Sequence, residues 1–276
     1  MNTLGTALVW QAEGRPAVVV EVAAHKGSVP REAGTRMLVA ADQVQGTIGG
    51  GHLEQQAIER ARALLRGEPL PAEQHLPLGP ALGQCCGGAV TLRYTALSES
   101  RPAEWALPEP RFFLQLYGAG HVGRAIVKLL EGLPCRVQWI DERESEFPAA
   151  ASAPHVERVC VEPVEAEVAA APPGAFYLVL THSHALDQAI TESILRRADF
   201  GFLGLIGSKT KRARFVHRFE ARGLAPDTIA RMTCPIGVPG IAGKEPEVIA
   251  VAVVAQLLQQ AQVAAATRLR PPAFAA

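Results

Sequence analysis

The segment Gly118-Ala-Gly-His-Val-Gly123 constrains the fold more than any other part of the chain, because of what flanks it. An apolar run at 112–117 precedes it, and a helical pattern at 122–131 follows it. A strand, a glycine loop and a helix in this order are the context of the G-x-G-x-x-G fingerprint. Gly118 would make the tight turn, Gly120 would let the backbone approach a phosphate, and Gly123 would let helix and strand pack closely. The N–H groups at the helix start favour an anion, so we predict an anionic or nucleotide-like ligand here.

Two further residues belong to this predicted site. Asp141 ends a second apolar run, 18 residues after Gly123. An acid at such a position accepts a hydrogen bond from a ribose hydroxyl in dinucleotide-binding folds. His121 lies inside the glycine loop, and we assign it a ligand contact rather than a catalytic role. The alternative is a structural turn that holds no ligand.

The chain after residue 110 alternates apolar runs with helical patterns, whereas the chain before it does not. Buried-type runs lie at 112–117, 137–140, 176–180 and 202–206, with helical segments between them. This pattern predicts a Rossmann-like, doubly wound parallel sheet over 111–267. Residues 1–97 predict a small α+β domain. The Pro-rich stretch 98–110 predicts an extended linker, and 268–276 a flexible tail. The fold class is therefore α/β.

Composition removes several classes of function. The chain has 27 Lys and Arg residues and 27 Asp and Glu residues among its 276, so its formal net charge is zero. Binding of nucleic acid or an anionic membrane through the charge of the whole chain is therefore not expected. The longest apolar run, 248–258, is shorter than the ~20 residues that span a bilayer, and the first ten residues do not resemble a signal peptide. Five cysteines do not make a disulfide framework in a chain of this length. We expect a cytoplasmic protein.

The first domain contains a second glycine-rich loop before a helix. Gly49, Gly50 and Gly51 predict either an anion-accepting nest or a tight crossing that needs glycine for packing, and the sequence leaves both open. The cations Lys26 and Arg31 lie in a nearby loop and would suit a phosphate or a pterin-sized polar ligand.

Adjacent cysteines form the most distinctive chemical feature. Cys85 and Cys86 precede two glycines, which would leave a thiolate accessible as a soft metal ligand or a sulfur carrier. Two buried, inert thiols are the alternative. The remaining cysteines are scattered and are expected to be structural.

Polar residues follow two further strands of the second domain. His182, His184 and Asp187 come after the run at 176–180, and they suit substrate contact, metal binding or structural capping. Ser208 and Lys209 follow the run at 202–206, and we predict that both contact the bound ligand, with Ser208 also as a helix N-cap. We interpret Lys211 as part of a solvated helix face. The final helix, 247–258, is apolar nearly all round, which predicts burial against the sheet and a homodimer.

With these residues in view, the chain resembles the XdhC/CoxI family of xanthine dehydrogenase accessory proteins. The matching segments, in family order, are Lys26-Gly-Ser-Val-Pro-Arg31, Gly46-Thr-Ile-Gly-Gly-Gly-His-Leu-Glu54, Gln84-Cys-Cys-Gly-Gly88, Gly118-Ala-Gly-His-Val-Gly123, Thr181-His-Ser-His-Ala-Leu-Asp187, Gly204-Leu-Ile-Gly-Ser208 and Pro235-Ile-Gly237. The last loop departs from the family, with Gly237-Val-Pro-Gly240 and Lys244-Glu-Pro-Glu247 in place of an acidic pattern and a Thr-Pro-Glu-Glu helix start.

The resemblance implies an accessory protein that binds the molybdenum cofactor in its molybdopterin form. Such a protein would support sulfuration of the cofactor by a cysteine desulfurase and deliver it to apo-xanthine dehydrogenase, without turnover of its own. It also implies that Cys85 and Cys86 contact molybdenum or its sulfur. Two alternatives remain: an NAD(P)-dependent oxidoreductase that binds a nucleotide at the glycine loop, and a metal-dependent enzyme that uses His182, His184 and Asp187.

Overall fold

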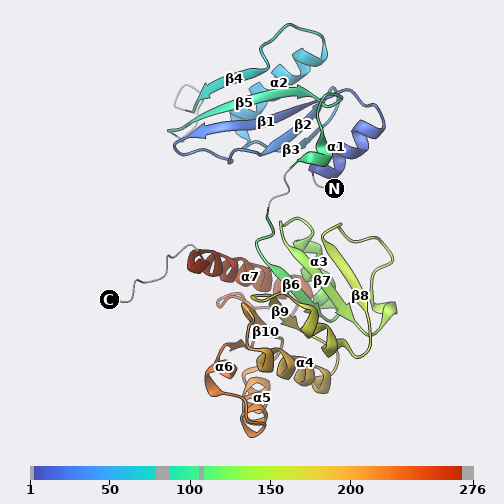
Figure 1. Ribbon diagram of the computed structural model, residues 1–276, viewed down its shortest axis with the longest axis vertical. Helices are drawn as coiled ribbons and strands as arrows, with labels where there is room; N and C mark the ends of the chain where they lie inside the picture. Colours follow the sequence, from blue (N-terminus) through green and yellow to red (C-terminus); the bar gives the residue numbers. More distant parts are fainter. Residues whose placement is uncertain (1–2, 79–86, 106–108, 269–276) are drawn as a thin grey trace. The chain divides into compact units, whose positions relative to one another are not determined.

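The computed structural model describes residues 3–78, 87–105 and 109–268. The chain divides into two compact units, Met1–Leu107 and Pro108–Ala276, which are described separately (Figure 1). Cys85, Cys86 and the predicted tail beyond Arg268 lie outside the described residues.

The first unit is an antiparallel sheet with the strand order β3-β2-β1-β5-β4. Its strands are β1 (Ala17–Lys26), β2 (Arg36–Ala40), β3 (Val44–Gly46), β4 (Glu73–Pro77) and β5 (Ala89–Ala96). Helix α2 (Gly51–Leu65) packs its apolar stripe against one face, where Val20, Met37 and Leu53 are fully buried. Helix α1 (Thr3–Ala12) covers part of the other face through Ala7 and Trp10. The predicted α+β domain is therefore present.

The predicted extended linker over 98–110 is wrong for its first half. Residues 98–105 form a turn and the short 3-10 helix η2 (Pro102–Glu104), which contacts α1. Pro102 is buried, and the Trp105 ring packs against the α1 core and receives the guanidinium of Arg36 at 4.9 Å. An aromatic ring that gains this burial outweighs the tendency of a Pro-rich segment to stay extended.

The second unit is a wholly parallel sheet with the order β11-β10-β9-β6-β7-β8. Its strands are β6 (Phe113–Tyr117), β7 (Arg136–Asp141), β8 (Val156–Cys160), β9 (Phe176–Val179), β10 (Phe202–Leu205) and β11 (Met232–Thr233). Numbered along the chain, the order is 3-2-1-4-5-6, which is the Rossmann arrangement. The predicted doubly wound fold is confirmed.

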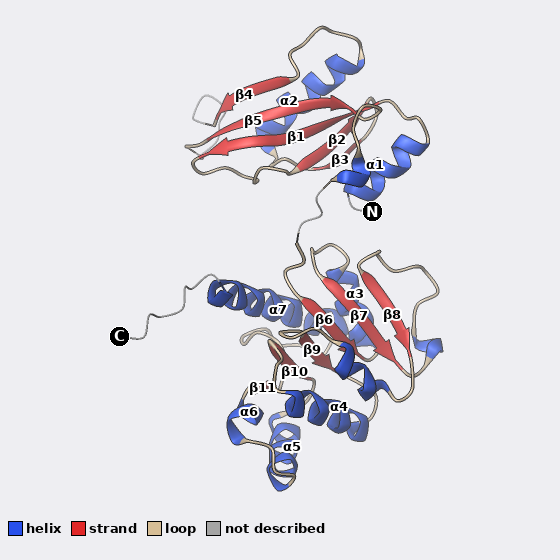
Figure 2. Cartoon of the chain, in the orientation of Figure 1, coloured by secondary structure: helices blue, strands red, loops and turns tan. Residues whose placement is uncertain are grey.

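Helices cover both faces of this sheet, which explains its continuous apolar strands (Figure 2). Helices α3 (His121–Leu130) and α7 (Pro246–Arg268) pack on one face around Ile126 and Val253. Helices α4 (His184–Arg197), α5 (Lys209–Ala221) and α6 (Pro226–Ala230) and the 3-10 helix η4 (Val164–Ala170) cover the other face. A further short helix, η3 (Glu144–Glu146), follows β7.

Helix α7 is longer than the sequence pattern predicted. It continues to Arg268 because Gln and Ala follow Leu258, and neither residue interrupts a helix. By length and composition alone it could cross a membrane, but a core helix of a soluble protein passes the same test. Ala250, Val253 and Leu257 of α7 are fully buried against the sheet.

Candidate functional site

The glycine loop lies at the switch point of the parallel sheet. Strands β6 and β9 are neighbours, and the chain winds away from them in opposite directions. The loops after these two strands therefore flank the crevice in which open α/β sheets bind ligands. They also touch: a Cβ on Gly118 would overlap the carbonyl oxygen of Leu180. The segments Gly118–Gly123 and Thr181–Asp187, which the sequence singled out separately, are thus brought together.

The three glycines have the distinct roles that the fingerprint assigns. Gly118 has φ +121°, a backbone conformation that favours glycine, and Gly123 has no room for a Cβ beside the Gly118 carbonyl. Gly120 differs from both, because a Cβ there would meet nothing within 4 Å. Its backbone is open at the start of α3, next to the exposed His121. This is the position at which a ligand could approach the helix N–H groups.

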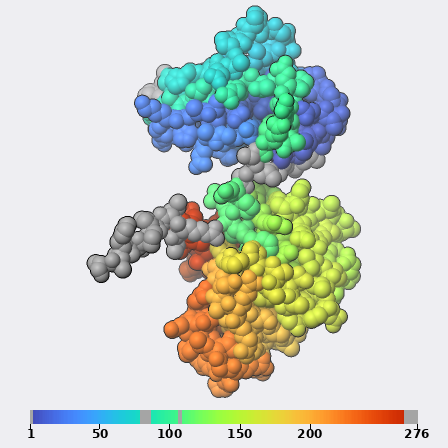
Figure 3. All heavy atoms as spheres, in the orientation of Figure 1, coloured from blue at the N-terminus to red at the C-terminus, as the bar shows by residue number. Residues whose placement is uncertain are grey.

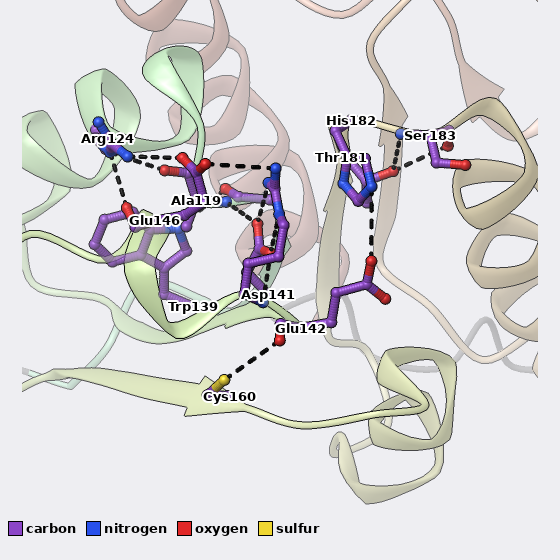
Figure 4. A network of polar contacts seen from close by, with 12 residues as sticks. Ala119, Arg124, Trp139, Asp141, Glu142, Glu146, Cys160, Thr181, His182 and Ser183 are labelled. Carbon is purple, nitrogen blue, oxygen red and sulfur yellow. Dashed lines mark hydrogen bonds and ion pairs between the residues drawn. The ribbon is translucent and has the colours of Figure 1, made fainter.

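Asp141 lies behind the glycine loop and is almost fully buried (Figure 4). Its Oδ2 accepts a hydrogen bond from the Ala119 N–H at 2.7 Å, and Arg143 donates to both carboxylate oxygens from its backbone and its guanidinium at 3.0 Å. Burial alone would raise the pKa of Asp141, but the hydrogen bonds from Arg143 and Ala119 together lower it. All the acceptor positions of the carboxylate are engaged. A ribose hydroxyl would have to displace one of these donors.

Four residues that the sequence analysis did not single out complete this network: Arg124, Trp139, Arg143 and Glu146. Arg143 lies 3.5 Å from Glu146, and Arg124 of α3 donates to the same carboxylate at 2.7 Å. The Nε of Arg124 also donates to the Ala119 carbonyl, and the Trp139 indole donates to the Gly118 carbonyl. The glycine loop is thereby fixed on both sides. Arg143, two residues after the predicted acid, was the one signal available in the sequence.

A cleft of about 270 Å³ opens at the ends of β9 and β10. It is lined by Thr181, His182, His184, Asp187, Ile206, Gly207, Ser208 and Lys211. Both histidines are exposed, and the His182 ring lies 3.6 Å from the Glu142 carboxylate. Most of the predicted polar contacts of the second domain therefore line one concave surface.

Asp187 is a structural group in this cleft. It accepts hydrogen bonds from the N–H and the hydroxyl of Thr181, at 2.9 and 2.7 Å. The Nζ of Lys211 donates to its second oxygen at 2.5 Å and to the Ile206 carbonyl at 2.8 Å. Both side chains of this ion pair are at least nine-tenths buried. Our interpretation of Lys211 as part of a solvated face is therefore wrong, because Asp187 draws its ammonium group inward.

Two helices begin at the rim of the cleft. Ser183 caps α4 and Ser208 caps α5, each through its side-chain oxygen. Ser208 is thus the N-cap that the sequence predicted, whereas Lys209 follows it as an exposed residue that is not among those lining the cleft. Within the described ranges, no three His, Cys, Asp or Glu side chains are grouped to hold a metal ion. This geometry gives no support to a metal site made of His182, His184 and Asp187, although all three line the cleft.

The glycine loop of the first unit is occupied by the chain's own carboxylate. Glu54 of α2 accepts hydrogen bonds from the N–H groups of Ile48 and Gly50, at 3.0 and 3.2 Å, and from the Thr47 hydroxyl. A Cβ on Gly49 would overlap the ring of Pro30. The sequence left open whether these glycines form an anion-binding nest or allow tight packing. The structure favours tight packing, and the N–H groups of the nest are bound by the Glu54 carboxylate.

The segments of the first unit that matched the family lie together. Gly88 packs so tightly that a Cβ would overlap the carbonyl oxygens of Lys26 and Ser28. The Leu78 N–H donates to the Gly88 carbonyl at 2.7 Å, which pairs the two ends of the stretch that contains Cys85 and Cys86. Lys26, whose carbonyl lies against Gly88, and Arg31 are both exposed.

The three described cysteines differ in exposure. Burial raises the pKa of Cys135 to about 11 and also raises that of Cys234, so both thiols stay protonated at neutral pH. Cys160 is exposed, and its thiol contacts the Glu142 carbonyl.

Comparison with known proteins agrees with this geometry. The model of the XdhC Rossmann domain matches residues 114–257, and the model of the XdhC and CoxI family matches residues 10–74. YqeB, an uncharacterised protein of Escherichia coli (strain K12), is 31% identical over 274 residues, which cover 94% of this chain and 46% of YqeB. The chain thus spans about half the length of that relative.

A solved structure shares the fold over the whole chain. The crystal structure described as a xanthine dehydrogenase from Bacillus halodurans matches with a TM-score of 0.68 and 20% identity, covering 100% of this chain and 98% of that one. Because the two family models match both units, and one of them covers more than half of the chain, the chain belongs to the XdhC and CoxI family.

Proposed function

We propose that this protein is a cytoplasmic accessory factor that binds the molybdenum cofactor in its molybdopterin form, supports its sulfuration and delivers it to apo-xanthine dehydrogenase. The observation that carries the proposal is the open backbone at Gly120, at the start of α3 and at the switch point of the sheet. The cofactor has a phosphate on its side chain, and helix N–H groups suit a phosphate.

The second unit offers complementary groups for the rest of the ligand. The polar cleft beside the loop contains His182, His184 and Ser208, which can hydrogen-bond a pterin ring. The Lys211–Asp187 ion pair fixes the cleft wall by joining α4 to α5. When bound, the cofactor would supply the molybdenum atom and the terminal sulfur that the acceptor enzyme uses. The residues of this chain would bind it, orient it and limit its exposure to water.

The proposal is tested by composition of the purified protein. The chain is expressed with and without an intact cofactor biosynthetic pathway, and its molybdenum is measured by elemental analysis and its pterin by fluorescence. We expect both signals, in similar molar amounts, only with the pathway intact. Purified chain that lacks both signals under these conditions would refute cofactor binding.

In the first unit, the proposal gives Cys85 and Cys86 the role of a soft donor to molybdenum or to its terminal sulfur, with a cysteine desulfurase as the sulfur source. Replacing both residues with Ser keeps the volume but removes the soft donor. Xanthine dehydrogenase matured with this variant should contain less cofactor, or cofactor without the transferred sulfur. Delivery at the wild-type level would show that the pair only packs.

A homodimer is also part of the proposal. Helix α7 has no charged residue between Glu247 and Arg268, and it leaves Val251 and Val263 at least half exposed. An uncharged helical face can pack against its own copy without like-charge repulsion. Sedimentation equilibrium should give twice the chain mass of 29.3 kDa, and Val251→Glu should reduce it to one chain mass. A wild-type monomer across a range of concentrations would contradict the dimer.

An NAD(P)-dependent oxidoreductase is the second candidate, and the strand order with its glycine fingerprint favours it. Asp141 weighs against it, because Arg143 and Ala119 occupy its oxygens. Titration with NAD+ and NADP+, followed by tryptophan fluorescence, distinguishes the two candidates. Micromolar nicotinamide binding with no molybdenum in the protein would favour the oxidoreductase.

A further inference from the structure

Helix α5 has an excess of positive charge that the rest of the chain does not share. From residue 207 to residue 222 there are six Lys or Arg residues and one acidic residue, Glu220, although the chain as a whole has 27 of each sign. The helix forms part of the outer surface of the second unit (orange in Figure 3).

Half of these cations hold α5 on α4. Lys211 pairs with Asp187, Arg218 donates to the Gln188 amide oxygen, and Arg222 pairs with Glu192. The charges of Lys211 and Arg222 are therefore balanced by acids of the same unit, and the Arg218 guanidinium is held by a neutral amide.

The other three, Lys209, Arg212 and Arg214, have a different environment, and we call them the α5 basic patch. Lys209 and Arg214 are exposed and Arg212 is half-buried. Among the residues that the structure describes, none accepts a hydrogen bond from these three side chains or forms an ion pair with them.

Two members of the α5 basic patch lie at the wrong end of the helix for stability. The N-terminus of a helix has a partial positive charge, and the first turn of α5 contains Lys209 but no acidic residue. Cations at this end of a helix destabilise it, most strongly at low salt. A negatively charged partner would remove this cost. Such a local conflict between sequence and structure is typical of a functional surface.

We propose that the α5 basic patch docks an acidic face of the protein that receives the cofactor. The inference rests on the proposed function, since it identifies the acceptor as the partner. Ser208 and Lys211, next to the patch in sequence, line the cleft, so a protein bound here would lie at the cleft mouth. Nucleic acid is a poorer fit, because three cations within two helical turns of a chain with pI 7.1 do not form a long basic stripe.

The test is association of the full chain with apo-xanthine dehydrogenase, measured by surface plasmon resonance over a range of NaCl concentrations. The patch variant combines Lys209→Glu, Arg212→Glu and Arg214→Glu. The matched control combines Arg111→Glu, Lys128→Glu and Lys244→Glu, which reverse three charges elsewhere in the same unit. Molybdenum content is measured for each protein, so that cofactor retention is read separately from docking.

We expect the wild-type affinity to fall with salt, and the patch variant to bind about tenfold more weakly or worse at low salt, mainly through a slower on-rate. The control should stay within about twofold of wild type, and all three proteins should retain the cofactor. Lys209→Glu alone should weaken docking while raising the melting temperature, because an acid suits the helix start.

If wild type and patch variant bind the acceptor with equal affinity, docking through the α5 basic patch is refuted, but the proposed function stands. A wild-type chain that retains cofactor yet does not bind the acceptor would refute delivery, and docking with it. Binding of duplex DNA more tightly than the acceptor would replace the protein partner with nucleic acid. If the triple variant fails to fold, the same three residues are changed to Ala.

Discussion

The two glycine loops of this protein look alike in sequence but differ in what fills them. Gly49, Gly50 and Gly51 bend around Glu54, a carboxylate from the helix that the loop itself begins. The loop from Gly118 to Gly123 has its acid, Asp141, at the back, where it holds the Ala119 N–H, and the helix start at Gly120 stays open. In the first loop the chain's own acid occupies the N–H groups at the helix start. In the second loop the acid binds the Ala119 N–H, so the helix start at Gly120 is left free for a ligand.

The difference follows from the origin of each acid. Glu54 is the fourth residue of α2, so it folds back onto the N–H groups of its own helix start in the manner of a capping box. Asp141 comes from the end of β7, the strand beside β6, so it reaches the loop from the sheet. The first loop is closed by local sequence, whereas the second is supported by tertiary structure.

The largest effect is expected where the second loop meets the strand beside it. Gly118→Ala forces a Cβ into the Leu180 carbonyl at a positive φ, so it should cost about 3 kcal/mol or more in the free energy of unfolding. Gly50→Ala, at φ +74° and ψ −173° with open space around it, is the matched control: it carries the cost of a glycine-favouring backbone conformation, about 1–3 kcal/mol, without the steric overlap, and should therefore cost less than Gly118→Ala. Urea denaturation measures both. Equal costs would mean that the two loops are not packed differently.

A smaller loss is expected from the acid behind the second loop. Asp141→Asn leaves Arg143 and the Ala119 N–H incompletely paired in a buried site, at a cost of about 2–3 kcal/mol at pH 7. Because the folded-state pKa of Asp141 is lowered, its stabilisation is present above the unfolded-state value near 4 and is lost as the pH falls below it. The difference between wild type and variant should therefore shrink below about pH 4. A difference that grows towards acid pH would contradict this.

The smallest effect on stability is expected at the first loop. Glu54→Ala removes a partly exposed cap and should cost about 1 kcal/mol, while Glu59→Ala, on the exposed side of the same helix, should cost less. The vacated N–H groups should then bind inorganic phosphate at millimolar concentration, detectable by a phosphate-dependent rise in melting temperature. No phosphate response in Glu54→Ala would show that the carboxylate is not what keeps this nest from binding anions.

The sequence predicts those parts of the molecule whose signals are local. The strand–glycine–helix unit at Gly118 and the Ser208 cap each depend on residues that are adjacent along the chain. The Lys211–Asp187 pair joins residues 24 positions apart and exists only because α4 and α5 pack side by side, which no local pattern specifies. Strand β8 was not among the predicted apolar runs, because Glu157 and Arg158 interrupt its apolar residues and the strand is only partly buried. The folded segment around Trp105 was missed because its partners lie in α1 and β2.

The central claim is that ligand reaches the open helix start at Gly120, and one comparison tests it directly. Gly120→Val places a side chain in space that is empty in the folded protein, so the melting temperature should change by about 1 °C or less. Gly132→Val, after the other end of α3, is the matched control. After co-expression with cofactor biosynthesis, Gly120→Val should lose nearly all of its molybdenum and pterin while Gly132→Val retains both. A folded Gly120→Val protein with wild-type cofactor content would contradict the account.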